Sequence, residues 1–165
     1  YVCVPHMDAQ HYRNRVETAL DEAEYEPITD EPTESFDSVW HKRSEDPTIG
    51  ITEDFVTVVD AEGVDDETLR ETAEEFRGVV TDIAPSKPGG MENRFGYLVC
   101  AVADPSDDLV EFATEEYTVA DRRTSVFPLI YDLDAETLYK HTVPRLKGRG
   151  FYEKQKQDAE SLFLF

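Results

Sequence analysis

The stretch Tyr97-Leu98-Val99-Cys100-Ala101-Val102-Ala103 decides the fold of this 165-residue chain. It runs without a charged or amide side chain, whereas a strand with one solvated face would alternate apolar and polar residues. The run therefore predicts a strand that is buried on both faces, as in sheets covered by helices. We expect Cys100 within it to be a reduced thiol that acts as a small hydrophobe.

Predicted helices and strands alternate on either side of this run. Helices are predicted at 8–23, 65–84 and 106–117, with Asp8, Asp65 and Ser106 as their N-caps and apolar periodicity in the first two. A last helix is predicted at 150–163. Strands are predicted at 1–5, 36–43, 48–52, 55–59, 97–103, 126–131 and 137–141, the last two forming a hairpin. Together they indicate an α/β (or α+β) fold in one domain, 1–165. Its central mixed sheet should have about five to six strands flanked by about four helices.

Acidic residues dominate the composition. The 37 Asp and Glu outnumber 16 Lys and Arg, and the formal net charge is −21. Such charge destabilises a compact state at ordinary ionic strength, whereas molar salt shortens the Debye length to about 3 Å. In its scattered acids the chain resembles the cytoplasmic proteins of salt-accumulating halophilic archaea; an acidic protein from an ordinary medium is the alternative. No apolar stretch approaches the roughly 20 residues that span a bilayer, so we expect a cytoplasmic protein without membrane contact.

Motifs that carry chemistry are missing from the sequence. Cys3, His6 and His11 lie near one another, but structural zinc needs four ligands in paired short spacings. The acidic stretch 132–136 lacks the glycine and distal glutamate of a calcium loop. The glycines of 88–90 do not join a strand to a helix as phosphate loops do. We therefore expect no metal and no cofactor and lean against an enzyme, although a site of dispersed residues would escape this reasoning.

The order of the predicted elements resembles the core of restriction-endonuclease-like nucleases over residues 8–130. In that family an acidic residue on one strand and a Glu-x-Lys-type motif on the next hold a divalent metal. The resemblance implies Asp37 and Asp60 for these places, but Asp60-Ala61-Glu62 has no lysine in the motif position. A divergent, inactive nuclease-like protein associated with nucleic acid is therefore the alternative function.

One segment departs from the acidic pattern. Residues 140–156 contain a single acid and six bases, namely Lys140, Arg145, Lys147, Arg149, Lys154 and Lys156. Several of these residues precede or begin a predicted helix, whose free N–H groups and dipole attract anions. Guanidinium groups also suit the forked geometry of carboxylates and phosphates. The candidate anion- or partner-binding residues are Arg145, Lys147, Arg149 and Lys154.

This basic segment predicts a class of function without a specific ligand. We expect a noncatalytic intracellular binding or assembly protein that uses residues 140–156 to contact an acidic protein or a second copy of the chain. Nucleic acid is disfavoured as the partner because high salt weakens phosphate contacts steeply. The simpler alternative, favoured because surface ion pairs are common, is that these bases pair with acids of their own chain and tie down the last helix.

Overall fold

The computed structural model describes residues 8–28, 36, 38–46, 50–83, 93–116, 120–121, 124–142 and 149–163. The described part contains four α-helices, a π-helical turn (η1) and seven strands of one sheet. In chain order the elements are α1 (Ala9–Glu22), β1 (Glu26–Pro27), β2 (Trp40–Asp46), β3 (Gly50–Asp60), α2 (Asp66–Ile83), β4 (Asn93–Val102), α3 (Asp107–Glu111), η1 (Phe112–Glu116), β5 (Ala120–Asp121), β6 (Thr124–Asp132), β7 (Thr137–Tyr139) and α4 (Arg149–Leu162). Among the helices described, none is both long and apolar enough to cross a membrane.

The sheet is mixed, with strands in the order β1-β2-β3-β4-β6-β5 and β7 also paired to β6. Its centre is parallel, because β4 lies between β3 and β6 and runs in the same direction as both. The β1–β2, β2–β3, β5–β6 and β6–β7 pairs are antiparallel. Every residue of β4 is buried, which confirms the doubly covered strand and the α/β class expected from the apolar run.

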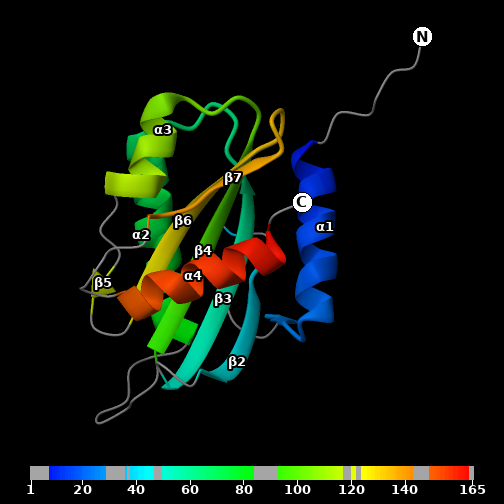
Figure 1. Cartoon of the computed structure of the whole chain (residues 1–165), viewed down its shortest axis with the longest axis vertical. Helices are drawn as coiled ribbons and strands as arrows, with labels where there is room; N and C mark the ends of the chain where they lie inside the picture. Colours follow the sequence, from blue (N-terminus) through cyan, green and yellow to red (C-terminus); the bar gives the residue numbers. More distant parts are fainter. Residues whose placement is uncertain are drawn as a thin grey trace.

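Helices cover both faces of this sheet (Figure 1). On one face α2 packs so closely that a Cβ atom on Gly96 of β4 would lie 3.0 Å from Phe76 Cε2, so glycine allows the approach. On the other face lie α1 and α4. There the rings of Tyr12 and Tyr131 stack at 4.0 Å, and Tyr97 meets Phe163 edge-on at 5.9 Å. The layer made by α1 and α4 is therefore built from helices at opposite ends of the described chain.

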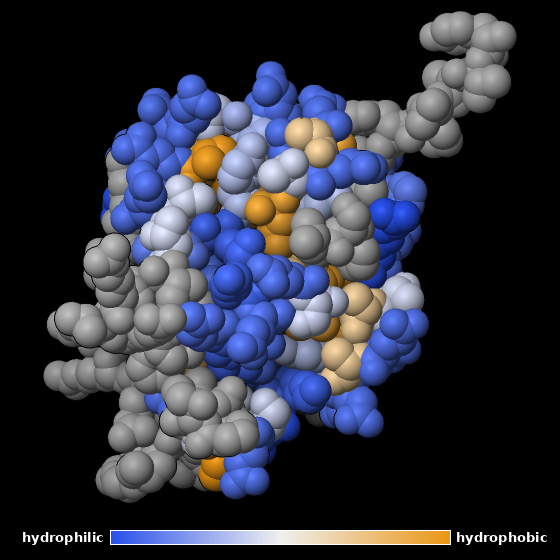
Figure 2. Space-filling view, in the orientation of Figure 1, coloured by the Kyte–Doolittle hydropathy of each residue, from blue (hydrophilic) through white to orange (hydrophobic). Residues whose placement is uncertain are grey.

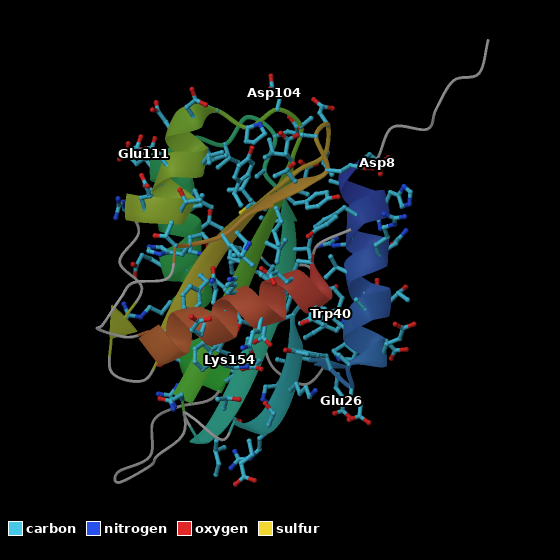
Figure 3. The ribbon with its side chains drawn as sticks, in the orientation of Figure 1. Asp8, Glu26, Trp40, Asp104, Glu111 and Lys154 are labelled. Atoms are coloured by element: carbon cyan, nitrogen blue, oxygen red, sulfur yellow. The ribbon has the colours of Figure 1, made fainter. Side chains whose placement is uncertain are left out.

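Three predicted N-caps are present. Asp8 Oδ1 accepts a hydrogen bond from His11 N–H at 2.8 Å at the start of α1, where Figure 3 labels Asp8. Asp65 and Ser106 do the same for α2 and α3, at 2.8 and 3.2 Å. These bonds satisfy N–H groups that have no partner within their own helix. The local signals for helix starts are thus confirmed at all three places.

Several element boundaries differ from the expectation, and strands β1 and β5 were not predicted. The strands predicted at 48–52 and 55–59 lie, as far as they are described, in one strand, β3, whose polar residues Glu53 and Asp54 both have partners. Residues 48–49 are outside the described part. Strand β2 begins at Trp40 rather than at residue 36. The third predicted helix is α-helical only as far as Glu111 and continues as η1. The strand predicted at 1–5 lies outside the described residues.

Candidate functional site

Lys154 belongs to α4, and its side chain, labelled in Figure 3, extends from the helix toward the sheet. Only 9% of this side chain is exposed. Its Nζ atom is 3.0 Å from Asp54 Oδ2 on β3 and 2.8 Å from Asp158 Oδ2, one turn later on α4. The ammonium also lies 5.3 Å from the centroid of the Phe95 ring. This placement corrects the expectation for Lys154. A buried cation held by two carboxylates of its own chain is unsuited to meeting an external anion.

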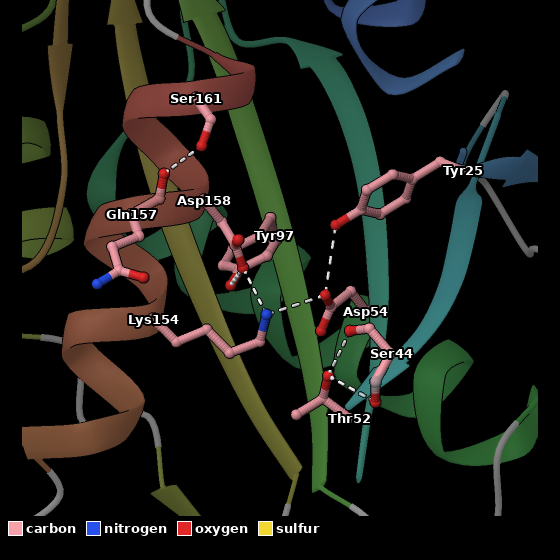
Figure 4. A network of polar contacts seen from close by, with 9 residues as sticks. All are labelled: Tyr25, Ser44, Thr52, Asp54, Tyr97, Lys154, Gln157, Asp158 and Ser161. Carbon is pink, nitrogen blue, oxygen red and sulfur yellow. Dashed lines mark hydrogen bonds and ion pairs between the residues drawn. The ribbon is translucent and has the colours of Figure 1, made fainter. Parts of the chain in front are cut away.

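Two tyrosines complete this cluster, which we call the Lys154 network (Figure 4). The Tyr97 hydroxyl donates to Asp158 Oδ2 at 2.5 Å, and the Tyr25 hydroxyl lies 3.4 Å from Asp54 Oδ2. Burial, followed by the charges of the nearby carboxylates, raises the pKa of both phenols above the ordinary value. Both tyrosines therefore remain neutral hydrogen-bond donors at neutral and mildly alkaline pH.

Asp54 is the most deeply buried charge of the network. Its side chain is 3% exposed, and within the described part of the chain its Oδ1 atom accepts no hydrogen bond. Desolvation raises the pKa of Asp54 to about 6; Asp158 adds to the rise, whereas the Lys154 ammonium opposes it. Two carboxylates thus share one ammonium in a site that little water reaches.

A second set of contacts holds the start of the basic segment. The His141 backbone N–H donates to Oε1 of Gln155, a fully buried residue of α4, at 2.9 Å. The Thr142 backbone N–H donates to the carbonyl of Thr114 in η1 at 3.1 Å. The chain is therefore fixed on two sides just before residues 143–148, and it is fixed again at α4 by the Lys154 network.

The remaining predicted site residues are only partly described. Arg145 and Lys147 lie outside the described residues, and Arg149 begins α4 without a described side chain. Lys140, another base of the segment, lies 3.7 Å from Glu160 of α4. Lys156 is exposed on the same helix. The described side chains on this side of the molecule are mostly hydrophilic, with small apolar areas between them (Figure 2).

Of the two acidic positions considered for metal chemistry, only Asp60 is described, and it has a structural partner. Asp60 Oδ1 accepts a hydrogen bond from Glu62 N–H at 3.1 Å, and Asp37 lies outside the described residues. Asp132 Oδ1 accepts from the N–H groups of Asp134 and Ala135 at 2.9 and 3.0 Å, which closes the turn between β6 and β7. The predicted hairpin is thereby confirmed. In the described ranges, no three His, Cys, Asp or Glu side chains are grouped as metal ligands.

Sequence reasoning missed Asp54 and assigned Lys154 to the surface. One signal was available: Lys154 and Asp158 are four residues apart on a helix, the spacing at which opposite charges meet. Nothing local indicated that Asp54, in a different half of the chain, would join them. Compared with protein-family models, with curated proteins and with solved structures, the chain matches none of them.

Proposed function

We propose that this chain is a noncatalytic binding or assembly protein of a salt-rich cytoplasm, and that it contacts an acidic partner through residues 140–156. The supporting observation is that contacts hold the chain both at the start of this segment and at the helix in which it ends. Gln155 and Thr114 hold the backbone at His141 and Thr142, and the Lys154 network holds the helix that follows. Fixing both ends of a short segment lowers the entropy cost of ordering it against a partner.

The external contact is assigned to four bases of the segment. Lys140 and Lys154 lie against carboxylates of their own chain, so the proposal rests on Arg145, Lys147, Arg149 and Lys156. Arginine forms paired hydrogen bonds to a carboxylate, and such bonds survive molar salt better than long-range attraction does. A second copy of this chain qualifies as an acidic partner, because its remaining surface carries the excess of Asp and Glu.

The test replaces Arg145, Lys147 and Arg149 together by alanine. Binding of a fluorescent poly-glutamate peptide is measured by anisotropy in about 2 M KCl, and self-association by sedimentation velocity. We expect the triple variant to lose about tenfold or more in affinity, or to lose self-association, since each lost contact contributes roughly 0.5–1 kcal/mol. Circular dichroism should show an unchanged fold.

The control replaces two bases outside the segment, Arg43 and Arg70, by alanine; Arg70 is exposed, and Arg43 is half-exposed. This variant should bind the peptide and sediment as the parent protein does. Equal peptide affinity and equal mass for the triple variant and the parent would overturn the proposal. Equal losses in both variants would mean that total charge, and not this segment, governs the binding.

A further inference from the structure

Three charged side chains meet between α4 and the sheet, and two of them, Asp54 and Lys154, are buried. Asp54 comes from β3, and Lys154 and Asp158 come from α4 (Figure 4). When all three are ionised, two negative charges face one positive charge. Because Asp54 is almost fully buried and its Oδ1 atom accepts no hydrogen bond from the described residues, the surplus negative charge is poorly compensated.

Among the residues that the structure describes, the other titratable groups close to Asp54 do not supply the missing positive charge. The hydroxyls of Tyr25 and Tyr97 donate to the two carboxylates but are neutral. Lys42 of β2 is the cross-strand neighbour of Asp54, and its Nζ atom lies 5.6 Å from the centroid of the Tyr25 ring. Within the described part of the chain no ion pair joins Lys42 to Asp54. A single added proton would bring the charge of the three-residue cluster to zero.

We infer that the docking of α4 on the sheet is linked to the uptake of one proton by the Asp54–Lys154–Asp158 cluster, so that α4 is held more tightly as the pH falls through the mildly acidic range. This linkage concerns the helix itself and does not require the proposed partner. As a consequence, pH should change how firmly residues 140–156 are held, since these residues lead into α4 and form its first turns.

The direction of the effect follows from the burial of Asp54. The pKa of Asp54 is about 6 in the docked state, because desolvation and then Asp158 outweigh the opposing Lys154 ammonium. When α4 leaves the sheet, water reaches this carboxylate and its pKa falls toward the ordinary value for aspartate. The docked state therefore binds more protons. Its extra stability is present in full below the detached-state pKa and is lost as the pH rises through about 6.

Hydrogen exchange of the α4 backbone amides tests this inference. Protection factors, corrected for intrinsic exchange rates, are measured in about 2 M KCl between about pH 5 and about pH 7.5. In the parent protein we expect α4 protection to fall by roughly tenfold over this interval, since one proton changes it by at most tenfold per pH unit and the fall levels off once the pH exceeds the docked-state pKa of about 6. The Asp54→Asn variant, which cannot take up the proton, should show a flat profile.

The matched control is Asp60→Asn, an exposed acid at the end of the same strand. It should reproduce the profile of the parent protein, and because both variants keep every histidine, any effect of histidine is common to all three proteins. If Asp54→Asn fails to fold, a carbon-13 carboxyl titration of the parent protein replaces it, with an expected Asp54 midpoint near pH 6. A flat parent profile, a slope that Asp54→Asn retains, or a midpoint at the ordinary value for aspartate would overturn the inference. None of these outcomes depends on peptide binding.

Discussion

The Nζ atom of Lys154 lies 3.0 Å from Oδ2 of Asp54, although the two residues are separated by 100 positions in the chain. This contact joins α4 to β3. Strands β1, β2 and β3 form one side of the sheet and come from the first half of the chain. Lys154, which the sequence assigns to an anion-binding surface, is instead buried and holds α4 against the sheet.

Replacement of Lys154 by methionine should destabilise the fold strongly. Methionine fills a similar space but leaves two neighbouring carboxylates without their cation, and breaking a buried pair in this way costs roughly 3–5 kcal/mol. The free energy of unfolding is measured by urea denaturation at constant KCl concentration. Adding Asp54→Asn to Lys154→Met should recover part of the loss, because one of the two orphaned charges is removed.

The control for this experiment is Lys156→Met, which changes the same residue type on the exposed side of α4. Its effect on the free energy of unfolding should stay within about 0.5 kcal/mol. If Lys154→Met costs no more than this control, the network does not hold the helix.

Replacement of Gln155 by methionine should release the start of the basic segment. The variant loses the acceptor of the His141 N–H group, and a buried hydrogen bond of this kind contributes about 1 kcal/mol. Hydrogen exchange at His141 should therefore accelerate about fivefold. Gln157→Met, on the exposed side of the same helix, should leave that exchange rate unchanged. Equal rates in the two variants would show that the His141 amide is held by something else.

Gly96 and Gly78 should respond to alanine in opposite directions. A methyl group on Gly96 would lie 3.0 Å from Phe76 Cε2 and 3.2 Å from Val126 Cγ2, and such overpacking costs about 1–3 kcal/mol. A methyl group on Gly78, in the middle of α2, meets nothing within 4 Å. There alanine should stabilise the protein by about 0.5–1 kcal/mol, because it favours the helix. Thermal unfolding of both variants checks the two signs together.

Salt should stabilise the fold. A net charge of −21 repels itself at low ionic strength, so the melting temperature should rise when KCl increases from about 0.1 M to about 2 M. Sucrose at matched osmolality is excluded from the surface but screens no charge, and it should raise the melting temperature less. Equal melting temperatures at both KCl concentrations would contradict the expectation of a salt-adapted protein.

Local patterns predicted most of the fold. The unbroken apolar run around Val99 became the buried β4, and the apolar stripe from Leu69 to Ile83 became α2. Capping residues such as Ser106 act within one turn, so their effect is visible in a few letters of sequence. The same local patterns predicted two strands where the structure has one, β3. Glu53 and Asp54 interrupt the apolar pattern, and their partners on other segments are visible only in the structure.

The candidate site was much less predictable, because it depends on contacts between distant segments. A lysine in a basic stretch usually points toward water, and only the crossing of α4 over Asp54 and Phe95 turns Lys154 inward. The expected anion-binding roles of Arg145, Lys147 and Arg149 stay predictions. The alternative in which the bases pair with acids of their own chain describes Lys154 and Lys140.

The pairing of α1 with α4 on one face of the sheet also bears on how the protein is made. The Tyr12 hydroxyl of α1 donates to the carbonyl of Phe163, the residue that follows α4, at 2.8 Å. During translation every described strand leaves the ribosome before α4 does, so the rings of Phe95, Tyr97 and Phe127 have no final cover until α4 has been synthesised. Nascent chains paused in this interval would present an open apolar face, and chaperone capture or aggregation should concentrate there.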